Sequence, residues 1–171
     1  MQNILTLRKT GVLNYKTARA VLAQALILSA ALVLPSVCHY FNLPVTKFVP
    51  MHWPVLLAGL VYGWRSGLML GVGAPVISFL ISGMPGGALL PIMALELAAY
   101  GFAAGFAKEK LNFNSVFAII CALACGKLIY IGAALIINGS FSLIFIKNAA
   151  LAMVFQIALL PVLADTWINR K

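Results

Sequence analysis

The stretch from Pro50 to Gly101 constrains the fold of this chain more than any other feature. It holds two short apolar segments, interrupted at Pro50-Met51-His52-Trp53-Pro54 and again at Gly83-Met84-Pro85-Gly86-Gly87. Pro and Gly end helices, and a very apolar chain tolerates irregular backbone only where protein or a water-filled cavity satisfies the polar groups. The two breaks therefore predict the rim of a binding cavity.

Long apolar runs make up most of the remaining sequence. Hydrophobic residues are 63% and charged residues 9% of the 171 positions, which is the composition of an integral membrane protein. We therefore predict an all-α fold with six transmembrane helices at about residues 17–37, 53–64, 67–81, 89–107, 115–137 and 149–168. Pro35 is expected to close the first of them. The second and third are short against the ~20 residues that a bilayer needs.

Positive charges predict how the chain is oriented. One side of the predicted bundle carries most of the Lys and Arg residues, namely Arg8, Lys9, Lys16, Arg19, Arg65, Lys108, Lys110, Arg170 and Lys171, and the loops of the other side carry Lys47 and Lys147. This bias predicts cytoplasmic termini in the inner (cytoplasmic) membrane and a cavity that opens to the outside. The domain prediction is a membrane domain at 17–168 between cytoplasmic segments at 1–16 and 169–171. The net charge of +9 thus indicates topology and no nucleic-acid partner.

Three predicted spans each carry one polar residue at a similar depth. At ~1.5 Å per helical residue, Glu96, Lys127 and Gln156 fall roughly 10–15 Å below the outer surface. Ionisable residues at membrane depth are candidates for function, but Glu96 and Lys127 also fit a structural ion pair. Gln156 likewise fits either a ligand contact or a hydrogen bond between helices. Both interpretations stay open.

The predicted site extends from these residues to their neighbours. The candidate substrate-binding residues are His52, Trp53, Glu96, Tyr100, Lys127, Tyr130, Asn148 and Gln156, and the candidate gating residues are Met51, Gly83, Met84 and Pro85. Aromatic rings can stack on a planar ligand while the polar side chains bind its rim, so we expect a compact aromatic or heterocyclic solute. The presence of both a Glu and a Lys argues against a purely anionic or purely cationic ligand.

Motifs of enzymes and cofactor proteins are missing from the sequence. It contains no Gly-x-x-x-x-Gly-Lys phosphate loop, no Gly-x-Ser-x-Gly elbow, no His-Glu-x-x-His and no Cys-x-x-Cys, so we predict no catalytic site, no cofactor and no metal. The chain cannot hydrolyse ATP by itself. Transport through such a cavity must then use a gradient or a partner that supplies energy.

Several segments together resemble one family of transporters. Pro50-Met51-His52-Trp53-Pro54-Val55-Leu56-Leu57-Ala58-Gly59, the run from Gly67 to Pro75, Gly83-Met84-Pro85 and Glu96-Leu97-Ala98-Ala99-Tyr100-Gly101 are similar to the substrate-binding S component of energy-coupling factor (ECF) transporters. The resemblance covers about residues 20–168. It implies high-affinity capture of a small vitamin-like micronutrient by one part of an ABC importer. It also implies partnership with a transmembrane coupling subunit and two ATPase subunits, and tilting of the whole protein in the bilayer.

Two other functions remain as alternatives. The first is a stand-alone proton-coupled secondary transporter of a small solute, in which Glu96 carries the proton. The second is an intramembrane enzyme with His52 and Glu96 as acid and base, although no nucleophile or metal set accompanies them.

Overall fold

A computed structural model describes residues 11–170, apart from the side chain of Phe145. Within this range the chain is all-α and contains no strand. Its helices are α2 (Ala18–Tyr40), α3 (Val45–Phe48), α4 (His52–Tyr62), α5 (Trp64–Ser82), α6 (Leu90–Glu109), α7 (Ser115–Asn138) and α8 (Leu143–Asn169). Residues 1–10 and 171 lie outside the described residues, and with them Arg8, Lys9 and Lys171 of the charge pattern.

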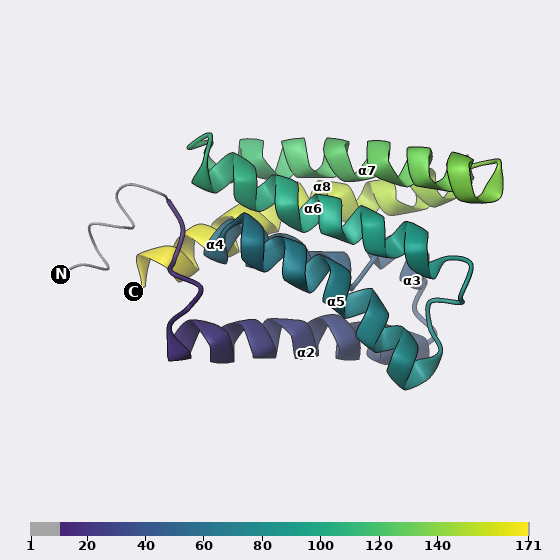
Figure 1. The fold of residues 1–171 in the computed structure, drawn as a ribbon, viewed down its shortest axis with the longest axis horizontal. Helices are drawn as coiled ribbons and strands as arrows, with labels where there is room; N and C mark the ends of the chain where they lie inside the picture. The colour runs from purple at the N-terminus through teal and green to yellow at the C-terminus, as the bar shows by residue number, and fades with distance from the viewer. Residues whose placement is uncertain (1–10, 171) are drawn as a thin grey trace.

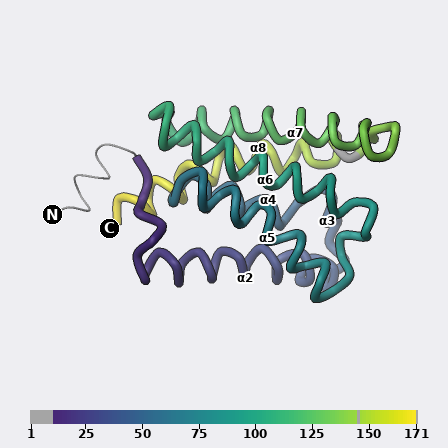
Figure 2. The backbone as a smooth tube through the Cα atoms, viewed as in Figure 1, coloured from purple at the N-terminus to yellow at the C-terminus, as the bar shows by residue number. Residues whose placement is uncertain are grey.

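The long helices run side by side along one axis, as Figure 1 shows. The described chain begins and ends at the same end of this bundle, which we call the termini end. The opposite end, the cavity end, holds the connections from α2 to α4, from α5 to α6 and from α7 to α8. The backbone path in Figure 2 shows the chain passing between these two ends along α2, α4, α5, α6, α7 and α8 in turn.

Five of these helices, α2, α5, α6, α7 and α8, are long and apolar enough to cross a membrane. Of the other two described helices, α3 has only four residues, and the 11 residues of α4 extend only about 16 Å at ~1.5 Å per residue. That is about half of a ~30 Å hydrocarbon core. Nevertheless every residue of α4 except Trp53 and Leu57 is buried, because α2, α5, α6 and α8 pack around it. In place of the six predicted spans, two of them short, the described residues form five long helices packed around the short α4.

Several predicted boundaries were wrong. Helix α2 does not close at Pro35 but continues to Tyr40, since a proline removes a single backbone donor and membrane helices tolerate it. The third span is not short, because α5 begins directly at Trp64 and has 19 residues. A single residue, Gly63 with φ 86°, makes the turn that precedes it. The last helix begins at Leu143, so Lys147 lies in a helix and not in a loop.

Glycines hold α5 and α6 in close contact. A Cβ added to Gly67 would overlap the backbone of Gly101, and a Cβ on Gly101 would overlap that of Gly67. One turn further along each way, Gly71 lies against the backbone of Leu97 and Gly105 against that of Trp64. Small residues of this kind let membrane helices approach closely. This antiparallel contact fixes the position of α6, the helix that carries Glu96.

Candidate ligand-binding cavity

A cavity of about 230 Å³ lies at the cavity end of the bundle. It is smaller than the ~300–1,000 Å³ typical of sites for drug-sized ligands, so it fits a compact molecule. All the described helices contribute to its wall, most of them through their ends. The wall consists of Pro35, His39, Val45, Thr46, Val49, Pro50, Met51, His52, Ser78, Met84, Pro85, Leu89, Ile92, Met93, Glu96, Lys127, Tyr130 and Ala149.

Polar groups in and behind this wall converge on the carboxylate of Glu96. Lys127 Nζ lies 2.6 Å from Glu96 Oε1 and forms an ion pair with it. The Tyr100 hydroxyl donates a hydrogen bond of 3.1 Å to the same oxygen, and His52 Nε2 lies 3.9 Å away. Only 7% of the Glu96 side chain is exposed. We call His52, Glu96, Tyr100, Lys127 and Tyr130 the Glu96 cluster.

Helix geometry explains how this cluster forms. Glu96 and Tyr100 are one turn apart on α6 and therefore share a face. The Tyr100 ring packs against α7 at Gly126, where a Cβ would collide with the ring. Lys127, the next residue on α7, has its Nζ 5.9 Å from the centre of the Tyr100 ring and 5.2 Å from that of Tyr130. At these distances the rings stabilise the ammonium group through cation–π attraction.

The imidazole of His52 is buried at the start of α4, with 5% of the residue exposed. Its ring meets that of Tyr100 edge to face, with 5.2 Å between the centroids. Neither ring nitrogen has a hydrogen-bond partner among the described residues, and 3.9 Å to Glu96 exceeds hydrogen-bond range. Leaving a buried polar group unpaired costs roughly 1–3 kcal/mol. A bound ligand in the adjacent cavity would relieve this cost.

The predicted site residues fall into two groups. His52, Glu96, Lys127 and Tyr130 line the cavity, as do Met51, Met84 and Pro85 of the predicted gate, whereas Trp53, Gly83, Tyr100, Asn148 and Gln156 do not.

Besides Tyr100, which bonds to Glu96, the second group contains four residues that lie elsewhere in the fold. Trp53 Nε1 donates to the Phe48 carbonyl at 3.0 Å and so ties α4 to α3. Gly83 ends α5 in a left-handed conformation, and Asn148 precedes the wall residue Ala149 on α8. Gln156 is 1% exposed, and its Nε2 has no hydrogen-bond partner among the described residues.

Sequence reasoning missed three polar residues of the wall, His39, Thr46 and Ser78. His39 lies four residues after Pro35, which also lines the cavity, so the two share one face of α2. That periodicity becomes visible only if the helix continues through the proline. Ser78 is a single hydroxyl near the end of an apolar helix, and no pattern in the sequence distinguishes it.

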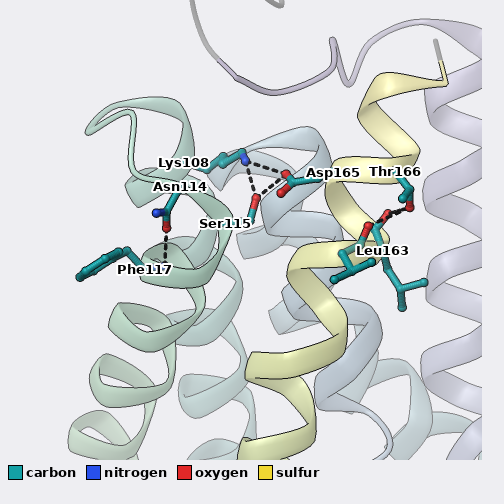
Figure 3. A network of polar contacts seen from close by, with 8 residues as sticks. Lys108, Asn114, Ser115, Phe117, Leu163, Asp165 and Thr166 are labelled. Carbon is teal, nitrogen blue, oxygen red and sulfur yellow. Dashed lines mark hydrogen bonds and ion pairs between the residues drawn. The ribbon is translucent and has the colours of Figure 1, made fainter.

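A second polar cluster lies at the termini end, where α6, α7 and α8 meet (Figure 3). Lys108 Nζ lies 3.0 Å from Asp165 Oδ1, and the Ser115 hydroxyl donates to the same oxygen at 2.5 Å. Lys108 also donates to Ser115. We call these three residues the Asp165 cluster. Next to it, the Asn114 side chain caps α7 by accepting a hydrogen bond of 2.8 Å from the backbone N–H of Phe117.

Comparison with known families identifies the chain. The model of the family described as ECF transporter, substrate-specific component, matches residues 20–170. The chain belongs to this family. The predicted resemblance and the prediction of a membrane transport component are thereby confirmed. No curated protein and no solved structure matches the chain.

Membership has several direct consequences for this S component. Its family binds substrates for transport and is not a family of enzymes. Members bind a small molecule and work with the membrane and ATPase subunits of an ECF module. Together with the five apolar helices, membership makes the chain a multi-pass membrane protein.

Proposed function

We propose that this S component captures a compact, vitamin-like micronutrient with an aromatic or heterocyclic ring and delivers it through an ATP-driven importer. Its partners in this proposal are a transmembrane coupling subunit and two ATPases. The observation that supports it is the buried Glu96 cluster beside a cavity of about 230 Å³. Ionisable groups at membrane depth are costly, and they typically mark substrate pathways.

The proposed orientation places both termini in the cytoplasm and opens the cavity to the outside of the cytoplasmic membrane. Among the described residues, the positive side chains at the termini end are Lys16, Arg19, Arg65, Lys108, Lys110 and Arg170, against Lys47 and Lys147 near the cavity end. This distribution follows the positive-inside rule.

Cysteine labelling tests the proposed orientation. Single cysteines are placed at Lys47 and Arg65 in a variant without the three native cysteines. An impermeant reagent should label the first in intact cells and the second only after permeabilisation, and the reverse result would contradict the orientation.

The proposed ligand contacts are those residues of the predicted set that line the cavity. His52, Glu96 and Lys127 bind the polar edge of the ligand, and Tyr130 packs against its ring. Tyr100 supports the site by holding Glu96 in place. The rim at Met84 and Pro85 closes over the bound ligand. Trp53, Asn148 and Gln156 lie outside the wall, so the proposal gives them no direct contact.

Uptake into reconstituted vesicles tests the source of energy. The small molecule that co-purifies with the protein is identified by mass spectrometry and then supplied in labelled form. Vesicles that contain the S component alone should bind it without accumulating it, and accumulation should require the coupling subunit, the ATPases and ATP. Accumulation that instead follows a proton gradient without ATPases would support the stand-alone secondary transporter, with Glu96 as its proton carrier.

A further inference from the structure

The charges and hydrogen-bonding groups of the cavity wall favour one class of ligand. We propose, on the basis of the function proposed above, that the site selects a molecule without net charge that carries a hydrogen-bond donor beside an acceptor. A primary amide and a lactam ring both have such an edge. Two independent features of the wall support this inference.

The first feature is the charge balance of the wall. Glu96 and Lys127 are the only Asp, Glu, Lys or Arg residues among the described residues that line the cavity, and they pair with each other at 2.6 Å. Apart from the two histidines, the remaining wall is apolar or carries hydroxyl groups. A ligand with net charge would lose its hydration and find no unpaired counterion, which is expensive in an apolar site. An uncharged ligand avoids this cost.

The second feature is that, among the described residues, side chains contact only one of the two carboxylate oxygens of Glu96. The contacts from Lys127, Tyr100 and His52 all reach Oε1, and among the described residues none reaches Oε2. An ionised carboxylate accepts through both oxygens, so Oε2 remains an open acceptor. An ammonium group has three N–H donors, and the Lys127 Nζ directs one of them to Glu96 Oε1. The wall therefore offers an open acceptor beside open donors, which complements the N–H and C=O of an amide.

The remaining wall residues indicate the size and polarity of the rest of the ligand. Three methionines, Met51, Met84 and Met93, line the cavity together with aliphatic residues, and Tyr130 adds an aromatic ring. Thioethers adapt to irregular shapes and make favourable contacts with aromatic rings. The volume of about 230 Å³ corresponds to the space of roughly eight water molecules at ~30 Å³ each. The ligand is thus compact, with one polar edge on an apolar or aromatic body.

Three probes of equal shape test this inference on the purified full-length protein. Benzamide is neutral, benzoate is an anion and benzamidinium is a cation at neutral pH, and all three share the same ring and planar head group. We expect benzamide to bind at least about tenfold more tightly than either ion, measured by calorimetry or thermal shift in lipid nanodiscs. Equal or tighter binding of benzoate or benzamidinium would overturn the inference, and so would the absence of binding by all three.

Two variants of the Glu96–Lys127 pair and one control test the role of charge balance in the same binding measurement. Lys127→Met leaves the Glu96 charge unpaired and should shift the preference toward benzamidinium, whereas Glu96→Gln should shift it toward benzoate. Asp165→Asn is the matched control, because it alters an ion pair far from the cavity wall and should keep the ranking of the parent. Folded variants that all keep the parental ranking would contradict the role of charge balance. If the buried-charge variants do not fold, the ranking in the parent protein still decides the question.

The outcome for the ligand class is separable from that for the proposed function. A protein that prefers benzoate but accumulates its co-purified ligand only with the ATPase module would keep the function and lose the ligand class. ATPase-independent accumulation with a preference for benzamide would keep the ligand class and contradict the proposed function.

Discussion

The two ends of the bundle each hold a lysine–carboxylate pair, and the pairs differ in what surrounds them. In the Glu96 cluster the Lys–carboxylate distance is 2.6 Å and the carboxylate side chain is 7% exposed; in the Asp165 cluster the corresponding values are 3.0 Å and 49%. Ser115 completes the second pair by bonding to both of its members, and about half of the Asp165 side chain is exposed. The first pair instead lies on a cavity wall. Among the described residues, none bonds to Glu96 Oε2, and neither ring nitrogen of the adjacent His52 has a hydrogen-bond partner.

A lysine–carboxylate pair alone therefore does not distinguish the proposed binding site from a structural contact. At the termini end, one hydroxyl bonds to both members of a partly exposed pair, and these bonds tie α6, α7 and α8 together. At the cavity end, the two ring nitrogens of His52 have no hydrogen-bond partner in the part of the chain that the structure describes, and the surrounding wall is largely apolar. Buried polar groups without a partner require an explanation, and a bound ligand is the one that we propose. The predictions that follow test this contrast, beginning with the largest expected effect.

Glu96→Gln should be the most damaging of these substitutions. It leaves the Lys127 ammonium without its counterion at membrane depth, which costs at least ~2.5 kcal/mol on insertion scales and up to ~5 kcal/mol for a broken buried pair. The double variant with Lys127→Met removes both charges and should recover most of the lost stability, but benzamide binding should remain weak. Thermal unfolding in detergent and benzamide calorimetry, on both single variants and the double, measure the two effects. A double variant that folds and binds like the parent would show that this ion pair, like the one in the Asp165 cluster, has only a structural role.

Gly126→Ala should displace Tyr100 and thereby disturb the Glu96 cluster. The added Cβ would collide with the Tyr100 ring and displace the hydroxyl that bonds to Glu96. Overpacking of this kind costs about 1–3 kcal/mol, and benzamide affinity should fall with it. Gly132→Ala is the matched control on the same helix, since a Cβ there meets nothing within 4 Å. Equal stability and affinity in the two variants would show that Tyr100 does not position Glu96.

The sequence predicted the Glu96 cluster better than the cavity around it. Glu96, Tyr100, Lys127 and Tyr130 were predictable because ionisable and aromatic residues stand out in apolar helices and because helical periodicity gives their depth. The wall residues His39 and Ser78 were not, since their positions depend on how far α2 continues beyond a proline and how α5 packs. Sequence periodicity reports one helix at a time, whereas a cavity forms between several.

The short helix shows the same limit in the fold. The Pro50 to Pro54 break and Gly63 marked both ends of α4, so its length was predictable within a residue or two. Its burial on nearly all sides was not, because that depends on the glycine contacts between α5 and α6 and on the packing of α2 and α8. An apolar sequence alone does not show whether lipid or protein surrounds the helix that it forms.

His52→Phe should separate binding from stability. Phenylalanine keeps a ring against Tyr100 and removes two buried nitrogens that have no hydrogen-bond partner among the described residues. The free energy of unfolding should stay the same or rise by about 1 kcal/mol, while benzamide affinity should fall about tenfold, as expected for a lost hydrogen bond. Gly132→Ala again serves as the control, because a Cβ there meets nothing within 4 Å and Gly132 does not line the cavity, so affinity should stay unchanged. A large loss of stability in His52→Phe with unchanged affinity would make His52 a structural residue.

Asp165→Asn should have the smallest effect of the four substitutions. The carboxylate is 49% exposed, so water and salt screen its attraction to Lys108, and exposed pairs of this kind contribute only about 0.2–1 kcal/mol. Asparagine also keeps an oxygen that can accept from the Ser115 hydroxyl. We therefore expect a small decrease in thermal stability, one that shrinks further at high ionic strength, and benzamide affinity equal to that of the parent. Glu96→Gln, measured in the same salt series, should lose stability by an amount that hardly depends on salt, because its pair is shielded from ions. If the two variants instead lose similar stability with similar salt dependence, exposure does not distinguish the two pairs and the contrast between the ends of the bundle fails.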